Sequence, residues 1–322
     1  MKNIKLLFLG LLATTSLLFT SCDDDPVEPE PEVTTAYDFI SSSTAHTSLK
    51  AALDAADLGT TLDDENATFT VFAPDNDAFA AFLTANNFAA LGDVPVDVLK
   101  SVLLNHVLGT KVNSGSLSNS YVSTLSATSY GSEIYHSLYV NIDNGVVLNG
   151  DVKVTGADND VENGTIHLVD KVIGLPNIVT FATSNPALST LVAALTTTGL
   201  TTDFVAALSG TGPFTVFAPT NDAFQALLDS NSNWNSLSDI PVATLEAVLK
   251  YHVTSAGNVR SGDLTDNQSV PTLQGDNLMI DLSMADAPKV EGTNSTAGLV
   301  TTLLDIQGSN GVVHVIDAVL VP

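Results

Sequence analysis

The chain has 322 residues, with 36 acidic against 10 basic side chains and a formal net charge of −26. This charge repels other polyanions, so it excludes nucleic acid and anionic membranes as partners of the general surface. A single cysteine excludes intramolecular disulfide bonds, and a chain of this length can bury a core without them.

The N-terminus has the layout of an export signal over residues 1–21. Lys2 and Lys5 precede an apolar run that is too short for a comfortable membrane span. Residues 18–22, LFTSC, resemble a bacterial lipoprotein signal, which implies that Cys22 carries a lipid anchor to the bacterial outer membrane or cell surface. The alternative is ordinary cleavage that leaves Cys22 as a free thiol. Residues 22–32 are acidic and rich in proline, and they predict an extended tether.

The body of the chain is a tandem repeat. FTVFAPDNDAF at 69–79 returns as FTVFAPTNDAF at 214–224, so Pro74 and Pro219 stand 145 residues apart. This period is that of a whole compact domain. Both copies end in a similar apolar strand followed by proline, GTIHLVDKVIGLP and GVVHVIDAVLVP. The repeat therefore predicts two domains, residues 33–176 and 177–322.

Each repeat begins with helical patterns. Leucines at an i,i+4 spacing, Leu49 with Leu53 and Leu191 with Leu195, open the two copies. The FTVFAP segment predicts a buried strand that is ended by proline, after which Asp75 or Thr220 can cap a helix. A second amphipathic helix is predicted over 94–107 and 240–253.

The second half of each repeat is strand-like. Leu138, Val140 and Ile142 alternate with polar residues before a turn at 143–145. Asn163-Gly164 and Asn310-Gly311 predict tight turns with positive φ at both central positions. Each turn leads into the last strand. The predicted fold class is α+β, in which helices are followed by an antiparallel sheet that the C-terminal strand closes.

The repeated blocks resemble the fasciclin domain family. The resemblance lies in TVFAPDNDAF and TVFAPTNDAF, in the helix ends at 105–106 and 251–252, and in GTIHLVDKVI and GVVHVIDAVL. It implies two domains, each a wedge-shaped β-sandwich-like core with packed helices. It also implies a secreted or cell-surface adhesion module that binds protein or glycan, with homotypic association as a further possibility. The structural motif residues are Pro74, Asp77, His167, Asp170, Pro219, Asp222, His314 and Asp317.

The family resemblance also implies an adhesion site at its Tyr-His pair. Tyr251 and His252 reproduce this pair in the second repeat, whereas Asn105 precedes His106 in the first. These four residues are the candidate binding residues.

Metal and catalytic sites are not predicted. His106, His252, His167 and His314 recur in repeated positions, without a second His or Cys at the spacing of metal ligands. A structural role is expected for them, and a surface position for the unrepeated His46 and His136. Asp77 and Asp222 are expected to stabilise the first turn of a helix.

The acidic run 158–164 lacks the glycine and glutamate of an EF-hand, which leaves only a weak cation site as an alternative. No nucleotide, hydrolase or metalloprotease motif occurs in residues 22–322, so we expect no cofactor and no enzyme activity. The leading prediction is a lipid-anchored adhesion or binding module. The alternatives are an envelope protein that binds a small ligand or glycan fragment, and an enzyme that acts on envelope glycans.

Overall fold

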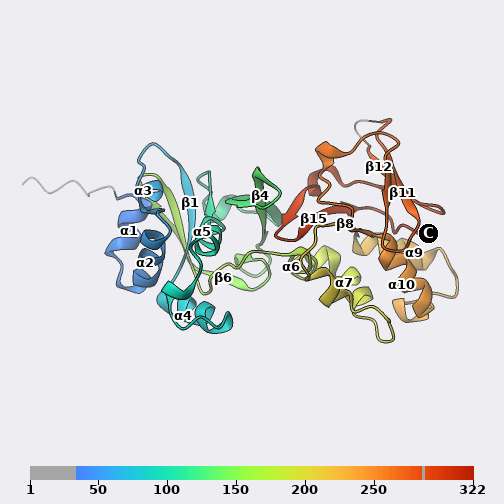
Figure 1. Ribbon diagram of the computed structural model, residues 1–322, viewed down its shortest axis with the longest axis horizontal. Helices are drawn as coiled ribbons and strands as arrows, with labels where there is room; N and C mark the ends of the chain where they lie inside the picture. The colour runs from blue at the N-terminus through green and yellow to red at the C-terminus, as the bar shows by residue number, and fades with distance from the viewer. Residues whose placement is uncertain (1–33, 285–286) are drawn as a thin grey trace, which may run out of the picture. The chain divides into compact units, whose positions relative to one another are not determined.

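The computed structural model describes residues 34–284 and 287–322. The predicted signal peptide, the predicted tether and Cys22 lie outside these residues. The first repeat is called domain 1 and the second domain 2. Figure 1 shows their elements along the chain.

Domain 1 alternates helices and strands in its first half and consists mainly of strands in its second half. Its helices and strands are α1 (Ala36–Ser42), α2 (Thr47–Ala55), α3 (Gly59–Leu62), β1 (Phe69–Pro74), α4 (Asn76–Ala85), α5 (Val96–Leu104), β2 (Val107–Leu108), β3 (Ser120–Thr128), β4 (Gly131–Asn141), β5 (Val147–Leu148), β6 (Val152–Val161) and β7 (Gly164–Val169). Short 3₁₀ turns include η1 (Thr44–His46), η2 (Leu91–Asp93) and η3 (Ser114–Ser116).

Domain 2 repeats this order with shorter strands. Its helices and strands are α6 (Ile178–Ser184), α7 (Ser189–Leu195), α8 (Phe204–Leu208), β8 (Phe214–Pro219), α9 (Asn221–Asp229), α10 (Val242–Tyr251), β9 (Val253–Thr254), β10 (Ser269–Pro271), β11 (Asn277–Asp281), β12 (Lys289–Glu291), β13 (Thr296–Gly298), β14 (Ile306–Gly308) and β15 (Gly311–Ile316). Its 3₁₀ turns include η4 (Pro186–Leu188), η5 (Leu237–Asp239), η6 (Ser261–Asp263) and η7 (Thr301–Leu303).

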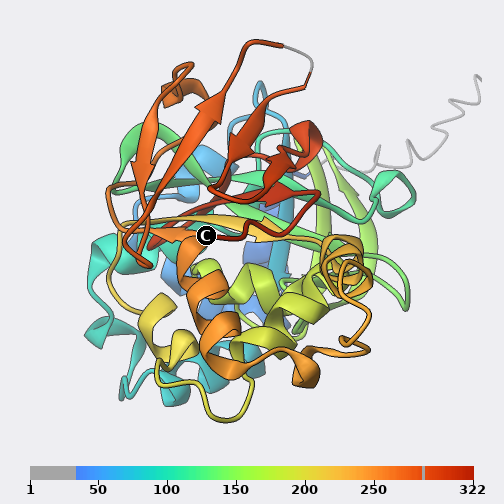
Figure 2. The same cartoon turned by 90° about the vertical axis from the view of Figure 1, so that its right-hand side faces the viewer.

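The repeated FTVFAP strand separates two cores in each domain. In domain 2, Val216 and Ala218 pack with the helices, whereas Phe217 packs with the residues of β10 to β13. Figures 1 and 2 show α6, α7 and α10 on one side of β8 and β15, and β11 and β12 on the other. The predicted alternation along this strand is confirmed, and it explains why β1 and β8 are apolar on both faces.

The expectation of an antiparallel sheet was wrong at its centre. β1 pairs in parallel with β7, from Phe69 opposite Gly164 to Pro74 opposite Val169, and β8 pairs in the same way with β15. The sheet orders are β2-β1-β7-β6-β5-β4-β3 in domain 1, and β14-β15-β8-β9 with a separate β10-β11-β12-β13 in domain 2. Parallel strands are buried on both faces, so these near-continuous apolar segments suit a parallel pair.

The predicted helix starts are confirmed by their caps. The Asp75 carboxylate accepts a hydrogen bond from the Ala78 N–H at 2.8 Å, and the Thr220 hydroxyl accepts one from the Ala223 N–H at 3.2 Å. Asp77 and Asp222 lie in the first turns of α4 and α9. There a carboxylate interacts favourably with the helix dipole.

The turn before each last strand lies one residue earlier than the sequence predicted. Val161 pairs with Gly164, so the loop residues are Glu162 and Asn163, and neither has positive φ. The buried Asn163 side chain accepts a hydrogen bond from the Ala36 N–H at 2.8 Å and donates one to the Leu62 carbonyl at 2.8 Å.

Asn310 makes the same two contacts in domain 2. It accepts from the Ile178 N–H at 3.0 Å and donates to the Leu208 carbonyl at 2.7 Å. In both domains the asparagine side chain therefore links the last hairpin to the first and third helices by hydrogen bonds.

No single helix of the described residues is long and apolar enough to cross a membrane. One bent pair among them, Ile178–Ser184 with Pro186–Leu195, meets the length and composition test with a bend of 100°.

Candidate functional site

The four candidate binding residues lie inside the domains. Asn105 and Tyr251 have no exposed surface, and His106 and His252 are 2% and 3% exposed. These side chains are therefore not accessible to a partner in this structure, and the prediction that they bind one directly was wrong. The helix ends that carry them turn inward because α5 and α10 pack their last turn against the sheet.

His106 and His252 join a helix to the segment after the last strand. Each ring Nδ1 donates to the carbonyl four residues earlier at 2.7 Å. Each Nε2 accepts a backbone N–H, from Ile173 at 2.8 Å or from Leu320 at 2.9 Å. Burial disfavours the charged ring and lowers the pKa of both histidines to about 4.

Asn105 and Tyr251 hold different segments. The Asn105 amide donates to the Gly174 carbonyl at 3.0 Å. The longer Tyr251 side chain donates its hydroxyl hydrogen to the Asn277 carbonyl and accepts the Thr293 N–H, both at 3.1 Å. Tyr251 therefore links α10 to the β12–β13 turn. The shorter Asn105 side chain cannot reach as far in domain 1.

Tyr251→Phe is expected to lower the free energy of unfolding of domain 2 by about 1–3 kcal/mol, because it leaves a backbone carbonyl and an N–H without their partner. Urea unfolding followed by hydrogen exchange of residues 292–295 checks this. Unchanged exchange in that turn would show that the hydroxyl does not hold it. Tyr135→Phe is the matched control, since Tyr135 is 38% exposed.

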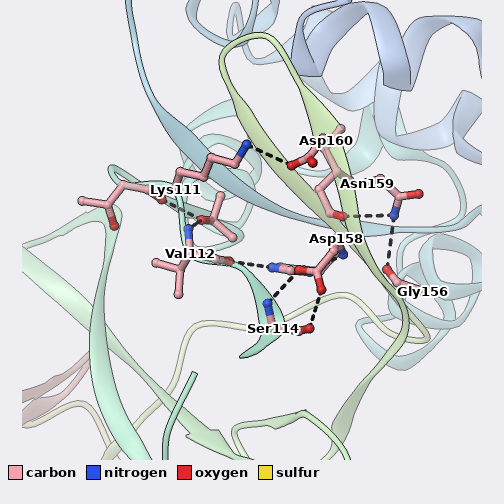
Figure 3. Close-up of polar contacts among 11 residues, drawn as sticks. Lys111, Val112, Ser114, Gly156, Asp158, Asn159 and Asp160 are labelled. Carbon is pink, nitrogen blue, oxygen red and sulfur yellow. Dashed lines mark hydrogen bonds and ion pairs between the residues drawn. The ribbon is translucent and has the colours of Figure 1, made fainter. Parts of the chain in front are cut away.

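His167 and His314 occupy equivalent polar networks. In domain 1 the Asp158 N–H donates to His167 Nδ1 at 3.1 Å, and His167 Nε2 donates to the Val112 carbonyl at 2.9 Å. The Asp158 carboxylate accepts the Ser114 N–H at 2.7 Å and the Ser114 hydroxyl (Figure 3). The Asp158 carboxylate is thus engaged in hydrogen bonds to Ser114 and holds the loop that contains this serine.

The domain 2 copy keeps this arrangement. Asp305 donates its N–H to His314 Nδ1 at 3.3 Å and accepts the Ser261 N–H at 2.7 Å, and His314 Nε2 donates to the Val259 carbonyl at 2.9 Å. Burial lowers the pKa of His314. Both nitrogens of each repeated histidine are therefore used inside the protein.

The expected surface position of the two unrepeated histidines was wrong. His46 and His136 are 4% and 3% exposed. His46 Nδ1 lies 2.7 Å from the Ser43 hydroxyl, and His136 Nδ1 lies 3.1 Å from the Ser126 carbonyl. Burial lowers the pKa of both rings. Among residues 34–284 and 287–322, no three His, Cys, Asp or Glu side chains form a group that could hold a metal ion.

The other motif residues hold strand ends. Asp170 accepts the Lys153 N–H at 2.7 Å, and Asp317 accepts the Gly298 N–H at 2.6 Å. Pro74 and Pro219 end β1 and β8. These contacts and strand ends give the motif residues a structural role in both domains.

Domain 2 contains a feature that sequence reasoning missed, an apolar cavity of about 40 Å³ between α6, α7, α8 and β8. Its lining includes Val179, Ala182, Leu191, Val192, Phe204 and Val205. Val205 is 40% exposed and lies at the solvent side. The sequence carries a signal for it, because Val179 and Ala182 on α6 stand where α1 has the larger Tyr37 and Ile40.

A family model for the fasciclin domain matches residues 44–176 and 186–322. The chain belongs to the fasciclin domain family. The predicted α+β fold with two fasciclin domains is confirmed. The chain is also similar in fold to a solved FAS1 domain pair from the insect cell adhesion molecule fasciclin I, with a TM-score of 0.52 and 20% identity, over 85% of this chain and 97% of that one.

Several relatives share fasciclin sequence with this chain. Transforming growth factor-beta-induced protein ig-h3 of Sus scrofa is 28% identical over 79% of this chain and 35% of its own length. Periostin of Homo sapiens is 28% identical over 79% of this chain and 28% of its own length. An uncharacterised protein of Synechocystis is 38% identical over 45% of this chain and 98% of its own length. The chain thus spans about a third of the length of these two animal relatives.

Proposed function

We propose that this chain is an exported, lipid-anchored surface protein whose fasciclin domains bind an extracellular protein and mediate adhesion without catalysis. The family match over both repeats carries the proposal. The fold neighbour named as part of a cell adhesion molecule supports it. The net charge of −26 supports a soluble, exposed module that does not adhere to anionic surfaces in general.

The proposal includes no enzyme activity, and the hydrogen bonds of the repeated residues support this part of it. A general base or nucleophile needs a free, accessible atom that can reach a substrate. The repeated histidines use both ring nitrogens for internal hydrogen bonds, and the Asp158 and Asp305 carboxylates bind serine groups of the same domain. The distinctive residues of the repeat are therefore structural.

Small-ligand binding is favoured by one observation, the cavity of domain 2. Its volume of about 40 Å³ and its apolar lining suit about one or two carbon atoms. A sugar ring needs a larger site with polar partners for its hydroxyls. The cavity therefore points to an apolar group, and the predicted binding of a glycan fragment has no support from it.

Deletion of the gene is expected to reduce attachment and aggregation of the cells, and the complete gene is expected to restore both. Cys22→Ser is the matched variant, since it removes the proposed lipid attachment and leaves the fasciclin domains intact. It should no longer incorporate labelled fatty acid and should fail to restore attachment. Equal attachment with and without the gene would refute the adhesion proposal, whereas fatty-acid labelling of Cys22→Ser equal to that of the unchanged chain would refute only the anchor.

A further inference from the structure

The two domains share a first helix with equivalent positions. α1 and α6 both have seven residues, and the first N–H of each donates to the hairpin asparagine. Ile40 and Ala182 therefore occupy the same place in the helix. Ile40 is completely buried in domain 1. An alanine lacks three of the carbon atoms of an isoleucine. One turn earlier, Ile178 stands in place of Ala36 and returns part of this volume, so the cavity beside Ala182 is small.

In domain 1 the space between α1, α2 and α3 is covered by Tyr37, Lys50 and Asp54, which we call the polar lid. The Tyr37 ring lies against Gly59, where an added Cβ would stand 3.0 Å from the ring. The Tyr37 hydroxyl donates to the Asp54 carboxylate at 2.6 Å, and Lys50 binds the same carboxylate at 2.7 Å. The space between α1, α2 and α3 is therefore filled and then closed.

Domain 2 has no such lid at the equivalent positions. Val179 stands in place of Tyr37, Val192 in place of Lys50, and Val205 in place of Gly59. All three valines line the cavity. The polar cover of domain 1 is thus replaced in domain 2 by an apolar mouth that is partly open to solvent.

We propose that this cavity is the anchor site for the end of one aliphatic side chain, of isoleucine or leucine, from a protein partner. The first repeat shows which group fits, because Ile40 fills the same place there. Buried apolar anchors in preformed pockets contribute much of the affinity of protein interfaces. The inference rests on the proposed binding function and locates it between α6, α7 and α8 of domain 2.

The size and charge of the site favour a side chain over a lipid. A volume of about 40 Å³ takes about one or two carbon atoms, the end of an aliphatic side chain, and leaves no room for the length of an acyl chain. The net charge of −26 also repels anionic membranes. A second copy of this chain would meet the same like-charge repulsion.

The test uses two amides as probes, N-acetyl-isoleucine N-methylamide and N-acetyl-alanine N-methylamide, added to the full mature chain. Methyl NMR is expected to show saturable shifts of Val179, Val192 and Val205 with the isoleucine amide. The alanine amide should leave these resonances unchanged. Absence of saturation, or an equal response to both amides, would overturn the proposal.

Ala182→Ile is the decisive variant, since it restores the side chain that fills the equivalent place in domain 1. It is expected to weaken isoleucine amide binding at least tenfold and to raise the midpoint of thermal unfolding, which shows that the variant folds. Ala193→Ile is the matched control on the exposed side of α7, and it should bind as the unchanged chain does. Unchanged binding to Ala182→Ile would overturn the proposal.

Cell attachment separates this inference from the proposed function. If deletion abolishes attachment while a folded Ala182→Ile chain still restores it, the anchor site is wrong and the adhesion proposal stands. If deletion has no effect while the isoleucine amide binds, the adhesion proposal is wrong and the site stands. Binding to phosphatidylcholine vesicles that Ala182→Ile abolishes, without any response to the amide, would overturn the proposal in favour of a lipid.

Discussion

Gly164→Ala is expected to lower the free energy of unfolding of domain 1 by more than about 4 kcal/mol, or to prevent its folding. Gly164 has a φ of 151°, which side chains rarely adopt, and an added Cβ would lie 1.9 Å from the Phe69 carbonyl oxygen. Phe69 is the first residue of β1 and pairs directly with Gly164, so moving it away would break the pairing of β1 with β7. Gly311→Ala is expected to have the same effect on domain 2, where the Cβ would lie 2.1 Å from the Phe214 oxygen.

Urea unfolding, followed by circular dichroism and by hydrogen exchange within each domain, measures these losses. Gly115→Ala and Gly262→Ala are the controls, because an added Cβ at either glycine meets nothing within 4 Å. Each control should stay within about 0.5 kcal/mol of the unchanged protein. A Gly164→Ala chain as stable as the Gly115→Ala chain would contradict the close approach of β7 to β1.

The second large effect is loss of stability in mild acid. His106 and His252 have pKa values of about 4 in the folded chain against 6.5 for an ordinary histidine. Between pH 6.5 and pH 4 the unfolded chain binds protons that the folded chain does not, so the free energy of unfolding falls as the pH falls. Each histidine contributes up to about 1.4 kcal/mol per pH unit. Since each domain contains one of them, each domain should lose on the order of 3 kcal/mol by pH 4, and above pH 6.5 they should have no effect.

Urea unfolding at a series of pH values measures this slope, and histidine NMR identifies its source. The ring resonances of His106 and His252 should not titrate between pH 7 and pH 5 in the folded protein. His106→Gln and His252→Gln should each reduce the slope in this range. Stability that stays constant from pH 7 to pH 4.5, or rings that titrate near pH 6.5, would disprove the buried neutral state.

The sequence was sufficient for the order of the elements and for the family. Their patterns are local: the strand FTVFAP, its terminal proline and the cap at Asp75 or Thr220 all act over a few residues. The doubled occurrence of these patterns made the domain organisation visible. Local patterns do not tell which strands become neighbours, and the parallel pairing of β1 with β7 joins segments about 95 residues apart.

The candidate site was less predictable because the type of a residue does not determine whether its side chain is buried. A tyrosine and a histidine at a helix end can face solvent or a core, and packing of the whole domain decides between them. Tyr251 and His252 turned inward, as did the unrepeated His46 and His136. The cavity was harder still to predict, since it depends on Ala182, a residue with no chemical function of its own.

The buried Asn163 and Asn310 have a consequence for how such chains grow. Each asparagine fastens the first helix of a domain to the last hairpin of that same domain. A domain that locks its own beginning to its own end has little to gain from exchanging segments with a neighbour. Copies can then be added one after another by gene duplication without mixing their parts, and a later copy is free to change a lid or a lining residue while the earlier one keeps its own.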